Sequence, residues 1–408
     1  MSFYYSEYDN MYGSEKFQVG YTTDETVTDP SNFTYGEVVT ASTRWQKYSQ
    51  IFPAGTKRIA IKYIYTRAWF LFLDNFLFKV PEEVSSFDLP IAGYGNGNGA
   101  YHLIASPIAD PITPNTGNGF ITTGTFDLYR FNQAANLEWE NWKAEGTGNF
   151  HFNIESGRGY LYANQAGTTL TFTGTPHTGN GEITLHKTAS AQLEGWNLIG
   201  NPFSTAKTIG SKPFYRMNAL GTEIIAAENN IVEAMEGIFV VAAEDGETVT
   251  FTAPLRSPQK GDDGDASIVL NISMPPQAPQ KGGVVIDRAI VRFCEGQTLP
   301  KLQIQENSTK IYFPQDGKDY AVVNANGTNE IPVNFKAAEN GEYTLSVSES
   351  LNSKFLILNY LHLIDSLTGT DVDLLATPTY TFTATTHDDA SRFRLVFSVP
   401  TERQDGSK

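Results

Sequence analysis

The sequence predicts an all-β protein. Runs of about five to eight residues alternate apolar and polar side chains, which is the period of a half-buried strand. Glycine (35 residues), proline (20) and aromatic residues (12%) are plentiful, as in loop-rich β proteins. No convincing helical periodicity occurs along the 408 residues.

The clearest alternating runs lie in residues 1–81. "KFQVGYTT" (Lys16 to Thr23) and "WFLFLDNFLF" (Trp69 to Phe78) are two of them, and "RIAIKYIY" (Arg58 to Tyr65) is a third. In the last of these, Ile59 and Ile61 share one face while Arg58 and Lys62 share the other. This pattern predicts an antiparallel strand with one buried side.

Residues 84–254 contain an internal repeat. Four landmarks recur in the same order: "YHLIASP" with "GWNLIGNP", "YRFN" with "YRMN", "GRGYLYA" with "MEGIFVVA", and "GTTLTFTG" with "GETVTFTA". We therefore predict a duplicated β module with copies at about 101–187 and 196–253. Neither copy is expected to bury its apolar face without the other.

The rest of the chain divides by composition. Residues 255–266 are predicted to be a linker, because "PLRSPQKGDDGDAS" (Pro254 to Ser267) is polar and rich in glycine and proline. Residues 267–399 hold short strands at regular spacing, which predicts a C-terminal β-sandwich. Residues 400–408 form a polar tail.

Charge and hydropathy exclude some partners. The formal net charge of −16 repels phosphate backbones and argues against nucleic acid. No apolar run is long enough to predict membrane insertion. The single cysteine, Cys294, forms no internal disulfide and is read as a small apolar residue on a strand rather than a nucleophile. The oligomeric state is left open.

Several stretches resemble a known family. "YYSEYDNMYGSEKFQVGYTT" and "FLFLDNFLF" resemble the later strands of a cleaved-adhesin jelly roll, a family found in hemagglutinins and in the non-catalytic regions of gingipain-type proteases. "NIESGRGYLYAN" and "GWNLIGNPF" resemble modules that follow such domains in surface proteins. Residues 361–397 are similar to the β domain that precedes a type IX secretion sorting domain.

The resemblance implies a fold, a location and a function. Residues 1–81 would be the C-terminal part of a jelly-roll β-sandwich, and the chain would be part of a longer exported protein that also has an N-terminal part and a sorting domain. The protein would be extracellular or at the cell surface and would bind a host protein or glycan through loops. The alternatives are an accessory region of a secreted protease or glycoside hydrolase, or a structural spacer.

Catalytic motifs are missing from the sequence. The six histidines are scattered, with no HExxH pattern, and neither a GxSxG elbow nor a phosphate-binding GxxxxGK[ST] loop occurs. The sequence thus predicts that the chain is not an enzyme.

Three residues are candidates for ligand binding. Glu138, Glu140 and Trp142 alternate along "LEWENW" and are expected to share one strand face. Two acids on one strand do not flank a sugar as glycosidase acids do, so we read them as solvated acids beside a tryptophan that could stack on a sugar. Core packing is the alternative for Trp142.

Asp74 is the candidate metal ligand. By strict alternation it shares a face with Phe70, Phe72, Phe76 and Phe78, where a bare carboxylate would be costly. The family resemblance implies that this aspartate helps to hold a structural calcium ion. The alternative is that the strand face turns outward at Asp74.

Overall fold

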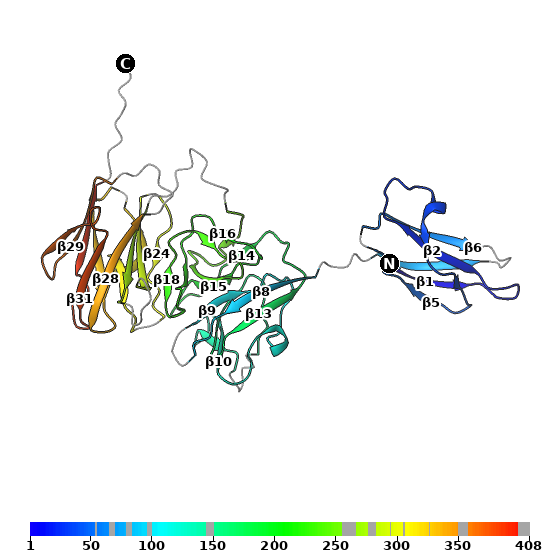
Figure 1. Cartoon of the computed structure of the whole chain (residues 1–408), viewed down its shortest axis with the longest axis horizontal. Helices are drawn as coiled ribbons and strands as arrows, with labels where there is room; N and C mark the ends of the chain where they lie inside the picture. Colours follow the sequence, from blue (N-terminus) through cyan, green and yellow to red (C-terminus); the bar gives the residue numbers. More distant parts are fainter. Residues whose placement is uncertain are drawn as a thin grey trace, which may run out of the picture. The chain divides into compact units, whose positions relative to one another are not determined.

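A computed structural model gives the fold of the chain. It describes residues 1–53, 55–64, 70–78, 84–95, 100–143, 151–254, 267–275, 283–293, 295–304, 307–325, 327–349 and 358–398. The predicted linker, the polar tail and Cys294 lie outside these residues. Secondary structure in the described part consists of strands and two three-residue 3-10 helices, which confirms the all-β prediction (Figure 1). No helix in this part is long and apolar enough to cross a membrane.

The chain divides into two compact units, Met1–Glu82 and Glu83–Lys408. The first unit packs the sheet β5-β1-β7 against a sheet in which β2 pairs with β3 and β4 on one edge and with β6 on the other. Its elements are β1 (Ser2–Glu7), β2 (Lys16–Thr22), η1 (Pro30–Asn32), β3 (Thr34–Tyr35), β4 (Val39–Thr40), β5 (Gln46–Ser49), β6 (Arg58–Ile64) and β7 (Leu71–Leu77).

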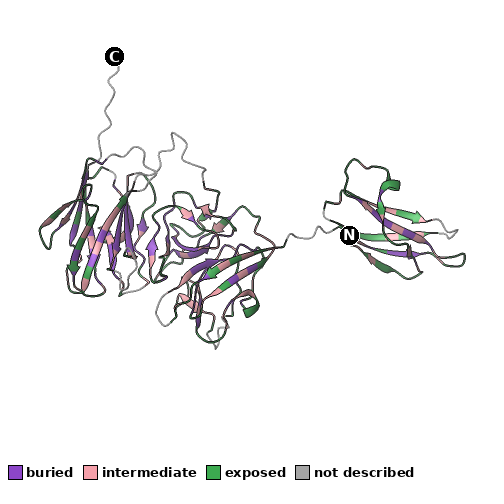
Figure 2. Ribbon diagram, viewed as in Figure 1, coloured by how far each residue is buried: buried purple, intermediate pink, exposed green. Residues whose placement is uncertain are grey.

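Alternation builds the core of the first unit. Phe3 and Tyr5 of β1 meet Phe17 and Val19 of β2 between the two sheets. Ile59 and Ile61 of β6 pack against this core, as their shared face predicts. The core is small, and Figure 2 shows many exposed positions on the strands of this unit.

The second unit begins with two modules of the same strand order. One sheet reads β11-β10-β12-β9 and the other β18-β17-β20-β15, and each module adds a two-stranded pair, β8 with β13 or β14 with β21. The elements of the first module are β8 (Ser85–Ile91), β9 (His102–Ala105), η2 (Thr116–Asn118), β10 (Phe126–Phe131), β11 (Trp139–Asn141), β12 (Gly159–Asn164) and β13 (Thr168–Gly174). Those of the second are β14 (Glu182–Thr184), β15 (Trp196–Gly200), β16 (Lys207–Thr208), β17 (Tyr215–Met217), β18 (Ile224–Ala226), β19 (Ile231–Val232), β20 (Gly237–Val241) and β21 (Thr248–Thr250).

The repeated phrases meet each other across the two modules. Ile104 of β9 bridges to Glu236, and Arg158 bridges to Ile199 of β15, so each "LI" strand pairs with the segment that precedes β20 or β12 of the other module. The N–H of Ala105 donates to the carbonyl of Met235 at 2.8 Å, and the N–H of Gly200 donates to that of Gly157 at 3.0 Å. This reciprocal contact gives a physical reason why the "LI" motif occurs in both modules.

The remaining strands form one continuous eleven-stranded sheet that curls around its own core. Among its described strands, the pair β23–β26 is parallel and the other pairs are antiparallel. Its strands are β22 (Ser267–Ser273), β23 (Val285–Arg292), β24 (Leu299–Pro300), β25 (Lys310–Gln315), β26 (Lys318–Asn324), β27 (Glu330–Lys336), β28 (Gly341–Glu349), β29 (Tyr360–Asp365), β30 (Thr370–Asp373), β31 (Thr379–Ala384) and β32 (Phe393–Ser398).

The modules and the curled sheet share a hydrophobic cluster. Val269 and Ile290 on the outer face of β22 and β23 pack with Trp196 and Phe239 of the second module and with Phe131 of the first. Strands β22 and β23 are therefore buried on both faces (Figure 2). Residues 83–408 form a single compact unit for this reason.

Candidate functional site: a polar groove between the two modules

A groove of about 780 Å³ lies where the two modules meet. Its walls come from the segments that follow β10 and precede β12 in the first module, and from β14, β15 and the turns beside them in the second. The residues that line it include Asn132, Gln133, Ser156, Gly157, Arg158, Glu182, Thr184, His186, Lys187, Thr188, Asn197 and Asp245.

Gln133 fixes the shape of one wall. Its side chain is 6% exposed and makes four hydrogen bonds. Its Nε2 donates to the carbonyls of His186 (2.6 Å) and Trp196 (3.0 Å), and its Oε1 accepts from the N–H groups of Thr188 (3.0 Å) and Gly195 (2.8 Å). A single buried amide thus holds the connection between the modules in place.

Other side chains face the groove with bonding capacity left over. The side chains of His186 and Asp245 are 71% and 70% exposed. The distance between His186 Nδ1 and Asp245 Oδ1 is 3.7 Å. Arg158 is 37% exposed and makes one long contact with Glu155, at 3.4 Å. A guanidinium has five donors, so most of this one remains available to a ligand.

A second cavity lies at the place that the repeat makes equivalent, on the other side of the modules. It is smaller than the groove and has a different lining. Its volume is about 350 Å³. Ala219 stands where the repeat places Gln133 in the first module, and Glu236 stands where it places Arg158. Glu236 is held by Arg216 through contacts of 2.9 and 2.6 Å, and Met235 adopts a left-handed φ of 58° where Gly157 has 79°. The first groove thus differs from the second in having a buried amide, Gln133, and an arginine with donors to spare, Arg158.

Ser156 brings a hydroxyl next to an imidazole at the edge of the groove. Its Oγ lies 3.3 Å from Nδ1 of His177. Burial lowers the pKa of His177, and its Nε2 is buried without a hydrogen-bond partner. Among the residues that the structure describes, no carboxylate bonds to the imidazole of His177 to orient it, as an acyl-transfer triad needs. Sequence motifs missed this contact because the two residues are distant in the chain.

The predicted ligand residues lie near the groove but none of them lines it. Glu140 of β11 bonds Nε of Arg130 and accepts from Asn132 Nδ2 at 3.0 Å. Burial alone would raise the pKa of Glu140, but hydrogen bonds from Asn132 and Arg130 outweigh it and lower the pKa. Glu138 contributes its carbonyl, which accepts from the N–H of Asn132 at 2.7 Å. These acids support the groove wall through Asn132.

Trp142 is half-buried and packs into the core of the first module. Its Nε1 donates to the carbonyl of Phe152 at 3.1 Å, and its ring contacts Phe126. His151 stacks on the indole with 4.3 Å between ring centroids, so the imidazole occupies a face that a sugar would need. Core packing, the alternative reading of Trp142, describes this environment.

Asp74 does not lie on one face with four phenylalanines. A β-bulge at Asn75 (φ 52°) shifts the register of β7 against β1, so Phe76 crosses to the inner side and stacks on the buried Phe3 at 4.9 Å. Asp74 stays on the outer face with Phe72, is exposed, and accepts from the N–H of Asn75 at 2.7 Å. The expectation of a buried Asp74 is wrong, because the face of β7 that Asp74 shares with Phe72 points outward before the bulge, as the alternative for this residue states.

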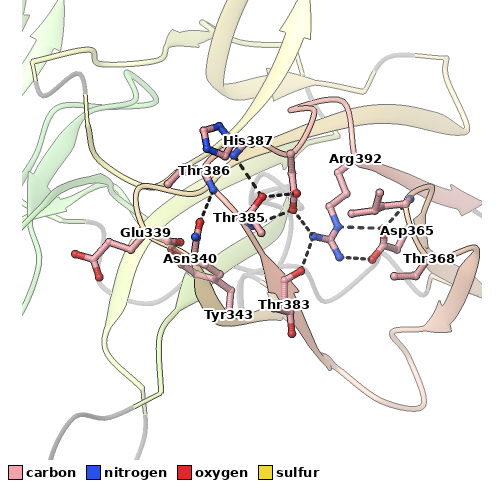
Figure 3. A network of polar contacts seen from close by, with 12 residues as sticks. Glu339, Asn340, Tyr343, Asp365, Thr368, Thr383, Thr385, Thr386, His387 and Arg392 are labelled. Atoms are coloured by element: carbon pink, nitrogen blue, oxygen red, sulfur yellow. Dashed lines mark hydrogen bonds and ion pairs between the residues drawn. The ribbon is translucent and has the colours of Figure 1, made fainter.

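No three His, Cys, Asp or Glu side chains gather into a metal site among the described residues. A polar network in the curled sheet is structural instead (Figure 3). Arg392 binds Asp365 through two contacts of 3.1 and 2.8 Å and donates to the carbonyl of Thr383 at 2.9 Å. Burial would raise the pKa of Asp365, but hydrogen bonds from Arg392 and Tyr380 lower it. The charges of Arg392 and Asp365 therefore pair with each other inside the fold.

Comparison with known proteins gives no relative. No family model, curated protein or solved structure matches the chain. The groove must therefore be interpreted from its own chemistry.

Proposed function

We propose that this chain is a non-catalytic, adhesin-like binding protein of the cell surface or the secreted fraction, and that the groove between the modules binds a neutral glycan. The glycan can be free or carried by a host protein. The observation that carries the proposal is the balanced, hydrogen-bonding lining of the groove.

Charge balance supports a neutral ligand. The lining contains two basic residues, Arg158 and Lys187, and two acidic residues, Glu182 and Asp245. The chain as a whole carries a formal charge of −16, so the groove departs from the acidic average of the protein. A strongly charged ligand would meet a like charge within the groove, which is unfavourable when water is excluded.

Mixed donors and acceptors support a ligand rich in hydroxyl groups. A hydroxyl donates one hydrogen bond and accepts others, so it can pair with Arg158 on one side and with Asp245 on another. His186 supplies both a donor and an acceptor when neutral. The volume of about 780 Å³ falls in the range of small-ligand sites and accommodates a short oligosaccharide.

The test is a glycan array probed with the purified chain. We expect saturable binding to neutral glycans in preference to sialylated or sulfated ones. A preference for anionic glycans, or binding only to unglycosylated matrix proteins, would contradict the proposal, and so would the absence of any binding.

A further inference from the structure

The outer side of the sheet β5-β1-β7 in the first unit carries large aromatic side chains. The buried Phe3 and Tyr5 turn toward the second sheet, so alternation turns Tyr4 of β1 to the opposite side. Rings from the neighbouring segments share this side, and each is between 41% and 63% exposed. We call this set the aromatic face, and its members are Tyr4, Tyr8, Trp45, Phe70 and Phe72.

The rings of the aromatic face form a continuous patch. The ring centroids of Trp45 and Phe72 are 6.5 Å apart, and those of Phe72 and Phe70 are 6.4 Å apart. Tyr8 continues the row at 6.3 Å from Phe70. Ser6, on the same side of β1 and paired with Phe72, is only 4% exposed, because the neighbouring rings cover it. Monomeric soluble proteins rarely expose apolar patches larger than about 300–600 Å², and larger ones mark interaction surfaces.

The area of this patch suits a protein interface. An aromatic side chain buries about 150–250 Å² when it is fully covered, so five half-exposed rings would bury about 400–600 Å². Together with the polar residues at the edges of the face, this approaches the roughly 800 Å² that each partner buries in a standard interface.

The tilt of the rings favours a protein partner over a sugar. A flat carbohydrate platform needs ring faces that lie in one plane, so that successive sugars can stack on them. Here Tyr8 stands at 85° to Phe70, and Trp45 at 42° to Phe72. Such edge-to-face and tilted arrangements are those in which aromatic side chains pack into one another. The face therefore suits the uneven surface of another protein.

The charges on this face are complementary to themselves. Lys47 of β5 and Asp74 of β7 lie in one row, on either side of Tyr4. Two strand spacings, about 10 Å, separate them. Both are exposed, and neither forms an ion pair within the described part of the chain. A half-turn of the face exchanges the positions of the two charges.

We propose that the aromatic face binds the same face of a second copy of this chain, which gives a two-fold symmetric dimer. A two-fold axis parallel to the strands puts each Lys47 opposite the partner's Asp74, and each Trp45 opposite the partner's Phe72. This axis also keeps the strands of the two sheets aligned, as in β-sandwiches. An axis across the strands would set Lys47 against Lys47, which is unfavourable.

The dimer is independent of the groove between the modules, because the two features belong to different units. It has a consequence for binding that rests on the proposed function. A dimer carries two grooves, so it should bind a surface coated with neutral glycan more tightly than a monomer does.

Sedimentation velocity of the full chain tests the dimer directly. We expect a dissociation constant in the micromolar range, because an interface of this size is modest. The buffer should have physiological ionic strength, since a formal charge of −16 on each copy opposes association at low salt.

Charge reversal tests the two-fold geometry. Lys47→Glu and Asp74→Lys should each weaken the dimer about tenfold or more, because each introduces two like-charge contacts. An equimolar mixture of these two variants should recover dimers, since every charged contact of the mixed dimer then joins opposite signs. Lys57→Glu, which reverses an exposed charge beside β6 of the other sheet, is the matched control and should leave the affinity unchanged.

Removal of a ring tests the apolar part of the interface. Trp45→Ser and Phe72→Ser should each abolish the dimer, and far-UV circular dichroism checks that both variants remain folded. Val38→Ser, which removes an exposed apolar side chain between β3 and β4, is the control and should still dimerise.

Four results would overturn the proposal. The first is a wild-type chain that stays monomeric throughout the concentration series. The second is a dimer that Lys57→Glu weakens as much as Lys47→Glu does, and the third is a mixture of the two charge variants that stays monomeric. The fourth is binding of a neutral glycan that Trp45→Ser abolishes and Arg158→Ala retains, which would assign the face to a sugar. A groove that binds no glycan would leave the sedimentation results unchanged.

Discussion

The reciprocal contact between the modules predicts an unusual sensitivity at Gly159. A Cβ added to this residue would lie 2.7 Å from the carbonyl oxygen of Ile199 and 2.8 Å from the side chain of Leu198. The first atom belongs to the backbone of β15 and cannot rotate away. The substitution Gly159→Ala must therefore push β15 and the second module aside.

The size of the effect follows from these distances. Forcing extra atoms into a packed interior costs about 1–3 kcal/mol, and we expect Gly159→Ala near the upper end. At Gly237, on the other half of the contact, an added Cβ would lie 3.1 Å from the carbonyl oxygen of Ile104. A shift of a few tenths of an ångström relieves that contact, so Gly237→Ala should cost about 1 kcal/mol.

Gly341 provides the matched control. It begins β28, and an added Cβ would meet no atom within 4 Å. Its substitution by alanine should be neutral or stabilise the protein by about 0.4–1 kcal/mol, since it restricts the unfolded chain.

The assay is guanidinium denaturation at 25 °C, followed by tryptophan fluorescence, to which Trp196, buried in the cluster shared by the modules, contributes. The expected order of midpoints is Gly341→Ala, then Gly237→Ala, then Gly159→Ala as the lowest. Equal midpoints for Gly159→Ala and Gly341→Ala would refute the reasoning.

Three further predictions concern other parts of the second unit. Arg392→Met should lower the free energy of unfolding by about 3–5 kcal/mol at pH 7, because it leaves the buried Asp365 carboxylate unpaired. The pKa of Asp365 is lowered in the folded wild type, so the stability that Arg392 contributes is lost as the pH falls and Asp365 is protonated; the difference between wild type and variant should therefore be smaller at pH 3 than at pH 7 in denaturation experiments. Burial and the charge of Asp287 raise the pKa of Glu223 to about 7, so wild type should lose stability as the pH rises from 4.5 to 7 while Glu223→Gln should lose less, as thermal melts across this range would show. If the Ser156–His177 contact has no catalytic role, Ser156→Ala should leave any slow hydrolysis of p-nitrophenyl esters unchanged, and a large loss of rate would reveal an esterase.

Local patterns predicted the strands well where alternation was regular. The shared face of Ile59 and Ile61 packs on the core of the first unit. The same rule failed just after Asp74, because one residue in a left-handed conformation, Asn75, moves Phe76 to the other face of the strand. Asn is a common choice for that conformation, so it was the available signal.

The site was beyond the reach of local patterns. Gln133 and Arg158 meet His186 only because the two modules pack against each other, and no spacing in the sequence encodes that distance. The repeat did carry a partial signal. Comparing its copies shows that Ala219 stands in the place of Gln133, and Glu236 in that of Arg158, so the copies differ at the residues that give the groove its chemistry.

Glu7 and Glu15 of the first unit are buried, which the sequence did not predict. Each lies beside polar, turn-like sequence, "SEYDN" and "GSEKF", where an acid is normally solvated. Their burial depends on how two sheets close at one end, which is a tertiary feature.

The central claim is that the groove between the modules binds a neutral glycan. The most direct measurement is calorimetric titration of the full chain with the strongest neutral glycan from the array, in wild type, Arg158→Ala and His186→Ala, with Arg394→Ala and His387→Ala as exposed controls outside the groove. Each groove substitution should weaken binding about three- to tenfold, the loss expected for one hydrogen bond, and neither control should change it. Equal affinities in all five proteins would contradict the account.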